Sequence, residues 1–586
     1  MTHTIKILPG GRVIKAASGT ILADALHEAG FPISLYCGKM GLCGKCFVEI
    51  IRGGLPHPDS QEKIILERLL LANNYRLSCR YRISGSLMIR IPEESLLPQM
   101  PVLTQGVRRT IAIDPPAKKV ALSLPRPDLS TPLALTDLIQ SRFPGVSLKI
   151  SAEALRVQAA FPEGPDMKMT AVVYKGSELT DIEPQDTTGR NFGLAVDLGT
   201  TTLVVELVDL NSGKTLDTEV GLNAQNRYGA DVVSRIAAAY ADPEKSRELK
   251  EVVVGALNEM IGRLLEKRHI PSNFVYEAVI AGNTAMNHLF LGLPVQTLAV
   301  SPYYALFSLL PALPAASTGL AINPRGKVYL APNIKSFVGG DIAAGLAAAD
   351  LASLPGNVLF IDLGTNGEIV LKKDRRFTAT STAAGPAFEG MNISCGMLAL
   401  PGAIYKAEFR NKLHVRTISG RPALGVCGSG LIDLVAVFLK NGLISSQGQI
   451  QGPGKRIRVT KDIFLNQKDI RQMQLAAAAV KTGIRLLLAK SRLVSRDLDA
   501  VYVAGALGST LNLYNSMALG LLPKCPEKKI FFIGNSSLAG ARALLLSRAE
   551  RSRCEKLVRR VRHLSLAEDA LFQKTFIDAL EFGAWS

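Results

Sequence analysis

Aromatic residues are scarce in this chain: Phe, Trp and Tyr make up 6% of its 586 residues, with 1 Trp. No run of Lys and Arg is interleaved with aromatic side chains, which argues against a nucleic-acid-binding protein despite a net charge of +18. No uninterrupted apolar stretch of about 20 residues is present, so no membrane span is predicted. The opening segment, MTHTIKILPGG, lacks the basic and apolar regions of a secretory signal. We therefore expect a cytoplasmic protein that binds neither nucleic acid nor membrane.

Cysteine is also sparse, and its distribution is uneven. Of the 8 cysteines, four precede residue 80 and four follow residue 390. Such clustering argues for a local metal site and against a disulfide framework. The early cysteines follow the spacing C-x5-C-x2-C-x32-C, and they are Cys37, Cys43, Cys46 and Cys79.

Four thiolates can hold an iron–sulfur cluster or a tetrahedral zinc ion. The glycines between them, Gly38, Gly41 and Gly44, let the loop wrap closely, so that backbone N–H groups can point at sulfides. The spacing is one residue longer than the plant-type ferredoxin pattern. It resembles the adrenodoxin-like branch of the [2Fe–2S] ferredoxins, which have a β-grasp fold. A [2Fe–2S] cluster is therefore predicted, with a structural zinc as the alternative.

Two later segments share one pattern, Gly193–Leu207 (GLAVDLGTTTLVVEL) and Leu359–Leu371 (LFIDLGTNGEIVL). In each, an apolar run ends at an aspartate, Asp197 or Asp362, and a Gly-Thr turn leads into a second apolar run. This pattern predicts a strand, a tight turn and an antiparallel strand. Two copies predict a duplicated fold in which one acidic hairpin from each half faces a shared cleft.

Such paired hairpins can bind a nucleotide between two lobes. Glycines let the backbone approach phosphates, and Asp197 and Asp362 can hold Mg²⁺ through water. Gly505 and Gly508 follow a buried strand and leave room for adenosine beside a helix N-terminus. The absence of G-x4-G-K-[ST] argues against a P-loop NTPase. The predicted ATP-binding residues are Gly199, Thr200, Thr201, Thr202, Gly364, Thr365, Asn366, Gly367, Gly505, Ala506 and Gly508.

These segments resemble the superfamily of actin, sugar kinases, acetate kinase and the large heat-shock chaperones. Residues 197–202 and 362–367 match its two phosphate motifs, and residues 503–508 match its adenosine motif. In that superfamily a carboxylate or amide some twenty residues before the second motif positions the attacking water or hydroxyl. Asp341 lies 21 residues before Asp362, so the resemblance implies catalytic roles for Asp341, Asp362 and Asp197. The alternative is that Asp341 is a helix N-cap.

At 586 residues the chain is too long for one core, so several domains are expected. Together with the resemblances above, this implies a multidomain α/β and α+β protein. Prolines concentrate between residues 92 and 118, which favours an extended connector there. We predict a β-grasp [2Fe–2S] ferredoxin domain at 1–92, a linker at 93–118, a small α+β middle domain at 119–188, and a duplicated actin-like ATPase domain at 189–586 with lobes of about 189–340 and 341–586.

Joined to a ferredoxin domain, the ATPase domain resembles the reductive activators of corrinoid proteins over essentially the whole chain. One departure is that the usual NPQ triplet is Asn-Ala-Gln here. The strings that carry this resemblance are Asn223–Gln225, Tyr228–Ile236, Gly282–Met286, Ala384–Gly390 and Cys427–Asp433.

The resemblance implies an ATP-dependent enzyme that returns inactive Co(II) corrinoid protein to Co(I) by one-electron transfer from its [2Fe–2S] cluster. Its expected cofactors are the cluster, ATP and Mg²⁺. Its expected partners are a corrinoid protein, of the acetyl-CoA pathway or of a methyltransferase system, an upstream electron donor and a second copy in a homodimer. One alternative is a small-molecule kinase or ATPase with a redox-sensing ferredoxin domain. Another is a chaperone-like binding module with a structural metal.

Several further features carry more than one interpretation. The basic stretch at residues 548–562 has helical spacing and is either a solvated helix face or a docking face. Cys395 and Cys427 could hold a [4Fe–4S] cluster between subunits, but their glycine-rich settings favour ordinary buried residues. Asp231 and Glu389 could contact the nucleotide or a partner, or cap helices.

Overall fold

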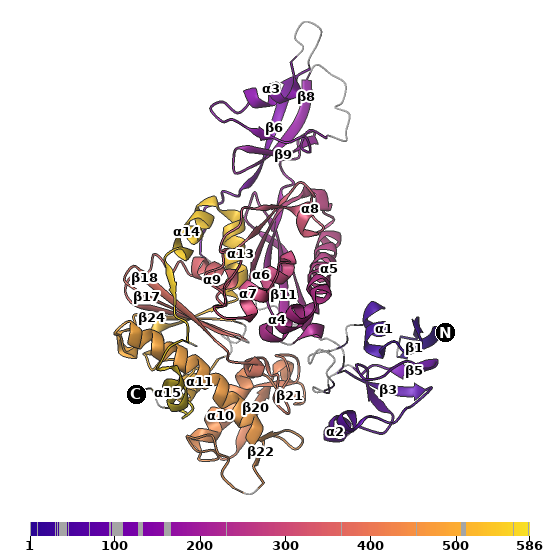
Figure 1. The fold of residues 1–586 in the computed structure, drawn as a ribbon, viewed down its shortest axis with the longest axis vertical. Helices are drawn as coiled ribbons and strands as arrows, with labels where there is room; N and C mark the ends of the chain where they lie inside the picture. The colour runs from indigo at the N-terminus through magenta and orange to yellow at the C-terminus, as the bar shows by residue number, and fades with distance from the viewer. Residues whose placement is uncertain are drawn as a thin grey trace.

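The structure is a computed structural model. It describes residues 2–8, 10–29, 31, 33, 41, 44, 46–69, 71–92, 95, 109–126, 133–156, 166–229, 231–364, 366–452, 454–505, 511–566, 568–583 and 585. The molecule is elongated, with a small domain at one end, two sheets and their helices forming the body, and the N-terminal region at the side of the body (Figure 1).

The N-terminal region forms a five-stranded mixed sheet in the order β2-β1-β5-β3-β4. Strand β1 pairs antiparallel with β2 and parallel with β5. Ile5, Leu26 and Ile89 are fully buried in the core of this domain. A helix packed against a mixed sheet is the predicted β-grasp arrangement. The elements are β1 (Thr2–Leu8), β2 (Arg12–Ala17), α1 (Leu22–Glu28), β3 (Phe47–Arg52), α2 (Ser60–Arg68), β4 (Tyr75–Leu77) and β5 (Leu87–Arg90).

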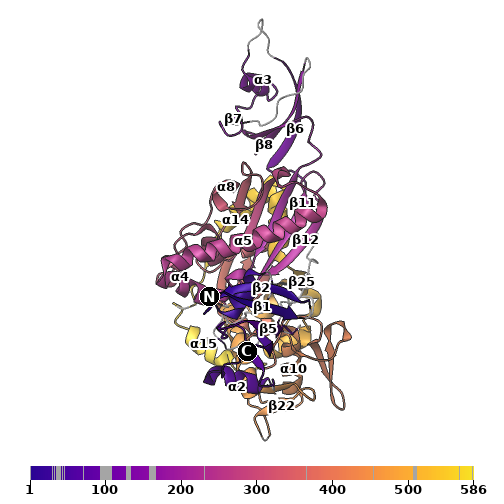
Figure 2. The same cartoon turned by 90° about the vertical axis from the view of Figure 1, so that its right-hand side faces the viewer.

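The small domain is a four-stranded sheet in the order β6-β8-β9-β7 with one helix packed against it. It stands apart from the body in both views (Figures 1 and 2). Leu155 lies in a turn, and residues 157–165 lie outside the described residues. The elements are β6 (Ala117–Pro125), α3 (Leu135–Ser141), β7 (Lys149–Ile150), β8 (Asp166–Tyr174) and β9 (Glu178–Pro184).

The body contains two six-stranded sheets of the same plan, ordered β12-β11-β10-β13-β15-β14 and β25-β24-β16-β17-β18-β26. In each, three consecutive antiparallel strands are followed in space by two parallel ones. The predicted duplication is therefore confirmed. The first sheet comprises β10 (Phe192–Leu198), β11 (Thr202–Asp209), β12 (Thr215–Leu222), β13 (Val275–Gly282), β14 (Leu313–Pro314) and β15 (Lys327–Leu330). The second comprises β16 (Val358–Leu363), β17 (Gly367–Lys373), β18 (Arg376–Thr382), β24 (Ala500–Ala504), β25 (Ile530–Gly534) and β26 (Val561–His563).

Two small-residue helices, α9 (Gly340–Ala348) and α13 (Ser536–Leu546), lie between these sheets. They pack so closely that a side chain at Gly540 would collide with the carbonyl group of Ala344. Their shared core joins residues of both sheets, including Phe360. Other helices cover the outer sides of the sheets: α4 (Val232–Ala241), α5 (Pro243–Arg268), α6 (Thr284–Leu291), α10 (Gly428–Lys440) and α11 (Gln467–Lys490).

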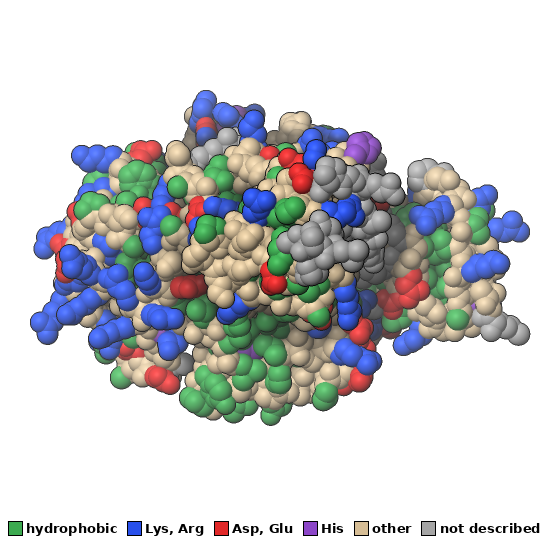
Figure 3. Space-filling model, turned by 90° about the horizontal axis from the view of Figure 1, so that it is seen from above, with side chains coloured by type: hydrophobic (Ala, Val, Ile, Leu, Met, Phe, Trp, Pro, Cys, Tyr) green, Lys and Arg blue, Asp and Glu red, His purple; other side chains and the backbone are tan. Residues whose placement is uncertain are grey.

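The basic stretch at residues 548–562 forms α14 (Arg548–Val558) and then β26. Its apolar residues, including Leu557, are buried in the core between the sheets. Arg551 is buried as well, and its guanidinium pairs with Glu277 on β13 at 2.9 Å. Many other Lys and Arg side chains are scattered over the molecular surface (Figure 3), as the net charge of +18 requires.

The fold class is as predicted, because the chain combines a β-grasp domain, a small α+β domain and a duplicated two-sheet domain. The exact domain boundaries stay a prediction. Among the described residues, no helix is both long and apolar enough to cross a membrane.

Candidate nucleotide and cluster sites

The first predicted phosphate hairpin is the turn between β10 and β11. Asp197, at the end of β10, accepts hydrogen bonds from Asn535 Nδ2 at 2.8 Å and from Ser537 Oγ at 2.7 Å. Both donors lie at the start of α13, so a helix that follows the second sheet's β25 holds the aspartate of the first sheet. Burial raises the pKa of Asp197, and the two hydrogen bonds lower it in part.

The second hairpin, β16 and β17, brings together two acids. The antiparallel register places Asp362 opposite Glu368, and Glu368 is buried. Sequence reasoning missed Glu368. Its signal was present in the string LGTNGE, because a short turn after Asp362 returns the chain with Glu368 beside it. Thr365, in the turn, lies outside the described residues.

Asp341 joins this acidic group from α9. The helix begins at Gly340 with Gly339 as its N-cap residue, so the N-cap interpretation of Asp341 is wrong. The Asp341 Oδ1 atom accepts a hydrogen bond from the Ile342 backbone N–H at 2.7 Å. Asp341 therefore remains beside the hairpin acids as one member of a cluster.

We call Asp197, Asp341, Asp362 and Glu368 the carboxylate cluster. Burial, and then repulsion from Asp197, raises the pKa of Asp341 to about 7. Burial together with the Asp341 and Asp197 carboxyls raises the pKa of Asp362 to about 7 as well. Burial, and then repulsion from the Asp341 and Asp362 carboxyls, raises the pKa of Glu368 well above its usual range. Such a cluster can take up protons near neutral pH, or it can be ionised by a nearby cation.

The two lobes also touch at the first hairpin. Thr201 Oγ1 donates a hydrogen bond to Glu389 Oε2 at 2.6 Å, and Glu389 follows the second sheet's β18. The contact makes the position of the Thr201 hydroxyl depend on the spacing between the lobes.

Asp231, the other acid with several possible roles, caps a helix: it forms a capping box with Ser234 at the start of α4.

Gly505, at the end of β24, adopts a φ of +98°. A side chain there would place its Cβ 2.5 Å from the Leu363 carbonyl oxygen and 3.1 Å from Asp362 Oδ1. Glycine is therefore required for β24 to approach the second hairpin. Ala506 and Gly508, the other predicted adenosine-binding residues, lie outside the described residues.

The cysteine site is described in part. Cys46 directly precedes β3 and Cys79 follows β4, and these strands pair with Phe47 opposite Leu77. Because the pairing is antiparallel, both cysteines emerge at the same end of the two strands, and both are buried. Gly41 adopts φ +72° and Gly44 φ +66°.

This region fits an iron–sulfur cluster, because two buried thiols converge beside a glycine loop. Cys37 and Cys43 lie outside the described residues. Among the residues that the structure does describe, no group of three or more His, Cys, Asp and Glu side chains is arranged to hold a metal ion.

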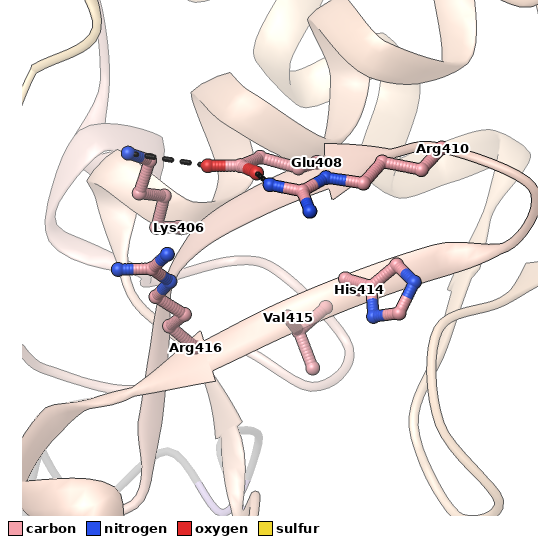
Figure 4. Close-up of a pocket in the computed structure, with 6 residues that line it drawn as sticks. All are labelled: Lys406, Glu408, Arg410, His414, Val415 and Arg416. Carbon is pink, nitrogen blue, oxygen red and sulfur yellow. Dashed lines mark hydrogen bonds and ion pairs between the residues drawn. The ribbon is translucent and has the colours of Figure 1, made fainter.

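Two other features lie away from the predicted residues. Cys427 is buried at the start of α10, where its Sγ donates to the Ile404 carbonyl oxygen at 3.2 Å, as expected of an ordinary buried cysteine. A hollow on the hairpin of β19 (Ala403–Phe409) and β20 (Leu413–Thr417) is shown in Figure 4, where Glu408 pairs with Lys406 and Arg410.

Four family models match consecutive parts of the chain between residues 5 and 584. Residues 5–84 match the 2Fe-2S iron-sulfur cluster binding domain, and residues 106–189 match the RACo linker region. Residues 192–353 match the RACo middle region, and residues 356–584 match the C-terminal ASKHA domain of RACo.

Individual relatives agree. The corrinoid activation enzyme RamQ of Eubacterium limosum is 31% identical over 605 residues, which cover 97% of each chain. The [Co(II) methylated amine-specific corrinoid protein] reductase of Methanosarcina barkeri is 27% identical over 67% of this chain and 77% of that protein. The solved structure of a reductive activator for corrinoid, iron–sulfur protein covers 100% of this chain and 99% of its own, with 32% identity and a TM-score of 0.74.

The fold and these matches show the class of protein: a [2Fe–2S] ferredoxin domain is joined to a duplicated, actin-like ASKHA domain. Within that class, the chain belongs to the RACo family, the reductive activators of corrinoid proteins. The predicted family is confirmed, while the roles of the individual site residues stay predictions.

Proposed function

We propose that this protein returns an inactive Co(II) corrinoid protein to Co(I) by one-electron transfer from its [2Fe–2S] cluster, and that ATP drives the step. The observation that carries this proposal is the end-to-end similarity to a corrinoid activation enzyme, in a chain that also brings the carboxylate cluster together between two hairpins. An upstream donor would supply the electron, and the cobalt of the partner is the substrate.

Cys37, Cys43, Cys46 and Cys79 would hold the cluster, which supplies one-electron transfer when bound. The convergence of Cys46 and Cys79 at one end of the β3–β4 pair supports this assignment. Their burial keeps water away from the thiolates, and the glycine loop beside them can offer backbone N–H groups.

The two hairpins would bind the β- and γ-phosphates of ATP, with Asp197 and Asp362 holding Mg²⁺ through its water shell. Asp341 would position the attacking water. The raised pKa values support a site made for a cation, because burial and mutual repulsion leave these acids short of positive charge.

ATP can promote an unfavourable electron transfer only by changing the relative affinity of the protein for two states of its partner. The Thr201–Glu389 contact between the lobes supports such a coupling, because phosphates at the first hairpin would compete for the Thr201 hydroxyl. A change in lobe spacing would then alter the grip on the corrinoid protein. A cytoplasmic location and a homodimer are part of the same proposal.

The test is anaerobic mixing of the protein, a reductant, MgATP and a Co(II) corrinoid protein, with the visible spectrum followed for Co(I). We expect Co(I) to form only when ATP is present. Cys46→Ser should abolish Co(I) formation and leave ATP binding intact, whereas Asp362→Ala should leave a reducible cluster without ATP-driven reduction. Absence of ATP-dependent Co(I) with every corrinoid partner tried would refute the proposal.

A further inference from the structure

The strings Asn223–Gln225 and Tyr228–Ile236 carry the family resemblance, yet the proposed function gives them no role. They form a short 3-10 helix followed by the start of α4, directly behind the first hairpin. At their centre lies Arg235, whose side chain is fully buried.

The Arg235 guanidinium donates to neutral acceptors. Nε donates to the Gly229 carbonyl oxygen at 2.9 Å, and Nη2 donates to the Thr200 carbonyl oxygen at 2.6 Å. Further donations reach the side-chain oxygens of Gln225 and Asn226. Among the described residues its hydrogen-bond acceptors include no carboxylate.

A buried guanidinium without an ion pair is costly, because its charge has left water without gaining an opposite charge. Burial lowers the pKa of Arg235 to about 9, although the more distant Asp231 and Glu389 carboxylates partly oppose the shift. The five donors of a guanidinium suit a clamp on several acceptors, and its hydrogen bonds are stronger than those of a neutral amide. Its positive charge is in addition available to an anion bound on the other side of the turn.

Arg235 belongs to a set of donors that fixes the turn of the first hairpin. The Gly199 carbonyl oxygen accepts from Asn223 Nδ2 at 2.8 Å, and the Thr200 carbonyl oxygen accepts from Arg235. The Thr201 carbonyl oxygen accepts from the Asn223 backbone N–H at 2.9 Å and from Asn226 Nδ2 at 3.2 Å. Three consecutive carbonyls thus accept from one segment, the 3-10 helix with its cap and the start of α4.

Peptide planarity makes the opposite side of this turn an anion site. In a trans peptide the N–H of the next residue points away from the carbonyl. With the carbonyls of residues 199–201 turned toward Asn223, Asn226 and Arg235, the N–H groups of residues 200–202 point the other way. Successive N–H groups on one side of a turn form a concave site for phosphate oxygens.

We propose that Arg235 is a positioning residue for the nucleotide's terminal phosphates. It orients the first hairpin so that the N–H groups of residues 200–202 face the phosphates, and its unpaired charge attracts them from behind the turn. This inference rests on the proposed function, because it takes the hairpin to bind ATP.

The test compares ATP with AMP, which lacks the phosphates that the hairpin would hold. Affinities for both are measured by calorimetry on the cluster-containing full chain, for the wild type, Arg235→Met and Arg235→Lys. We expect Arg235→Met to weaken ATP binding by about 10- to 100-fold with little change for AMP. Arg235→Lys restores the charge without the fork of donors and should recover part of the loss.

Arg551→Lys is the matched control, because Arg551 is equally buried but does not touch the hairpin. It should lower the unfolding temperature without changing the ratio of ATP to AMP affinity. An unchanged ratio in folded Arg235→Met and Arg235→Lys, with normal ATP binding by the wild type, would overturn this inference alone. Failure of the wild type to bind ATP would overturn the proposed function and this inference together.

Discussion

Two buried arginines in this protein lie in opposite surroundings. Arg551, on α14, donates to Glu277 Oε1 and to the Tyr174 hydroxyl, each at 2.9 Å, and so ties the small domain to the first sheet. Arg235, behind the first hairpin, has only neutral acceptors among the described residues. Arg551 is in direct contact with a carboxylate, whereas the Asp231 and Glu389 carboxylates act on Arg235 without bonding to its guanidinium among the described contacts.

This difference between the two arginines distinguishes a residue that stabilises the fold from one beside the proposed ATP site. At Arg551 the fold itself supplies an opposite charge, that of Glu277. At the hairpins, Arg235 is buried among neutral acceptors, and burial and mutual repulsion raise the pKa values of Asp341 and Asp362 to about 7. A magnesium–nucleotide, which carries charges of both signs, is the ligand that we propose for this region. Buried charges without a counter-charge at short range are consistent with that proposal.

The largest expected effect is that of Glu277→Gln, which removes the carboxylate partner of Arg551. This change leaves the Arg551 charge buried without a counter-charge, which should cost about 3–5 kcal/mol of the free energy of unfolding. Denaturant unfolding monitored by fluorescence measures the loss. ATP affinity of the folded protein should not change, and a loss below about 1 kcal/mol would show that Arg551 does not depend on Glu277.

Asp341→Asn tests the raised pKa of an acid in the carboxylate cluster. The Asp341 pKa is about 7 in the folded protein against an ordinary value of 3.8. Between pH 4 and 7 the unfolded chain releases this proton while the folded protein retains it, so the free energy of unfolding falls as pH rises. Removing the acid should therefore stabilise the nucleotide-free protein by about 1–3 kcal/mol at pH 8, and by less at pH 5.

Paired unfolding curves of the wild type and Asp341→Asn at pH 5 and pH 8 measure this effect. The difference between the two proteins is the relevant quantity, because other acids have the opposite trend. The Arg548 and Lys118 side chains, for example, lower the pKa of Asp114 to about 2. A stabilisation that is equal at both pH values would contradict the raised pKa.

The contact between the lobes gives a smaller effect. Thr201→Val keeps the side-chain shape but removes the hydrogen bond to Glu389, which should cost about 1 kcal/mol of stability. Glu389→Gln keeps an acceptor and should cost less. Thermal unfolding without nucleotide measures both, and an unchanged unfolding temperature of Thr201→Val would show that the Thr201 donor does not contribute to stability.

The smallest expected effect on stability is that of a solvent-exposed ion pair. Arg247 on α5 pairs with Glu244 at 2.6 Å, and both side chains are about two-thirds exposed. Because water screens such a pair, Arg247→Ala should change the free energy of unfolding by no more than about 0.5 kcal/mol. A larger loss in denaturant titration would show that the surface charges are coupled more strongly than their exposure suggests.

Much of this organisation could be predicted from the sequence. The two hairpins were found because an apolar run, an aspartate and a Gly-Thr turn form one local pattern, and the pattern occurs twice. The cysteine loop was found because its spacing and glycines are also local. Glu368 was missed, since its position opposite Asp362 depends on the register that the turn sets. The helix start at Asp341 was misjudged by a residue or two, as helix ends often are.

By itself, the sequence determined the ferredoxin cysteines, the duplicated hairpins and the family, because these depend on residue types at short, fixed spacings. Only the tertiary structure decided which buried charges have a partner of opposite charge. Arg551 meets Glu277, 274 residues away, whereas Arg235 meets a turn 35 residues away and no carboxylate among the described residues. Whether a buried charge is paired depends on packing between distant segments, and the sequence pattern around each arginine does not specify it.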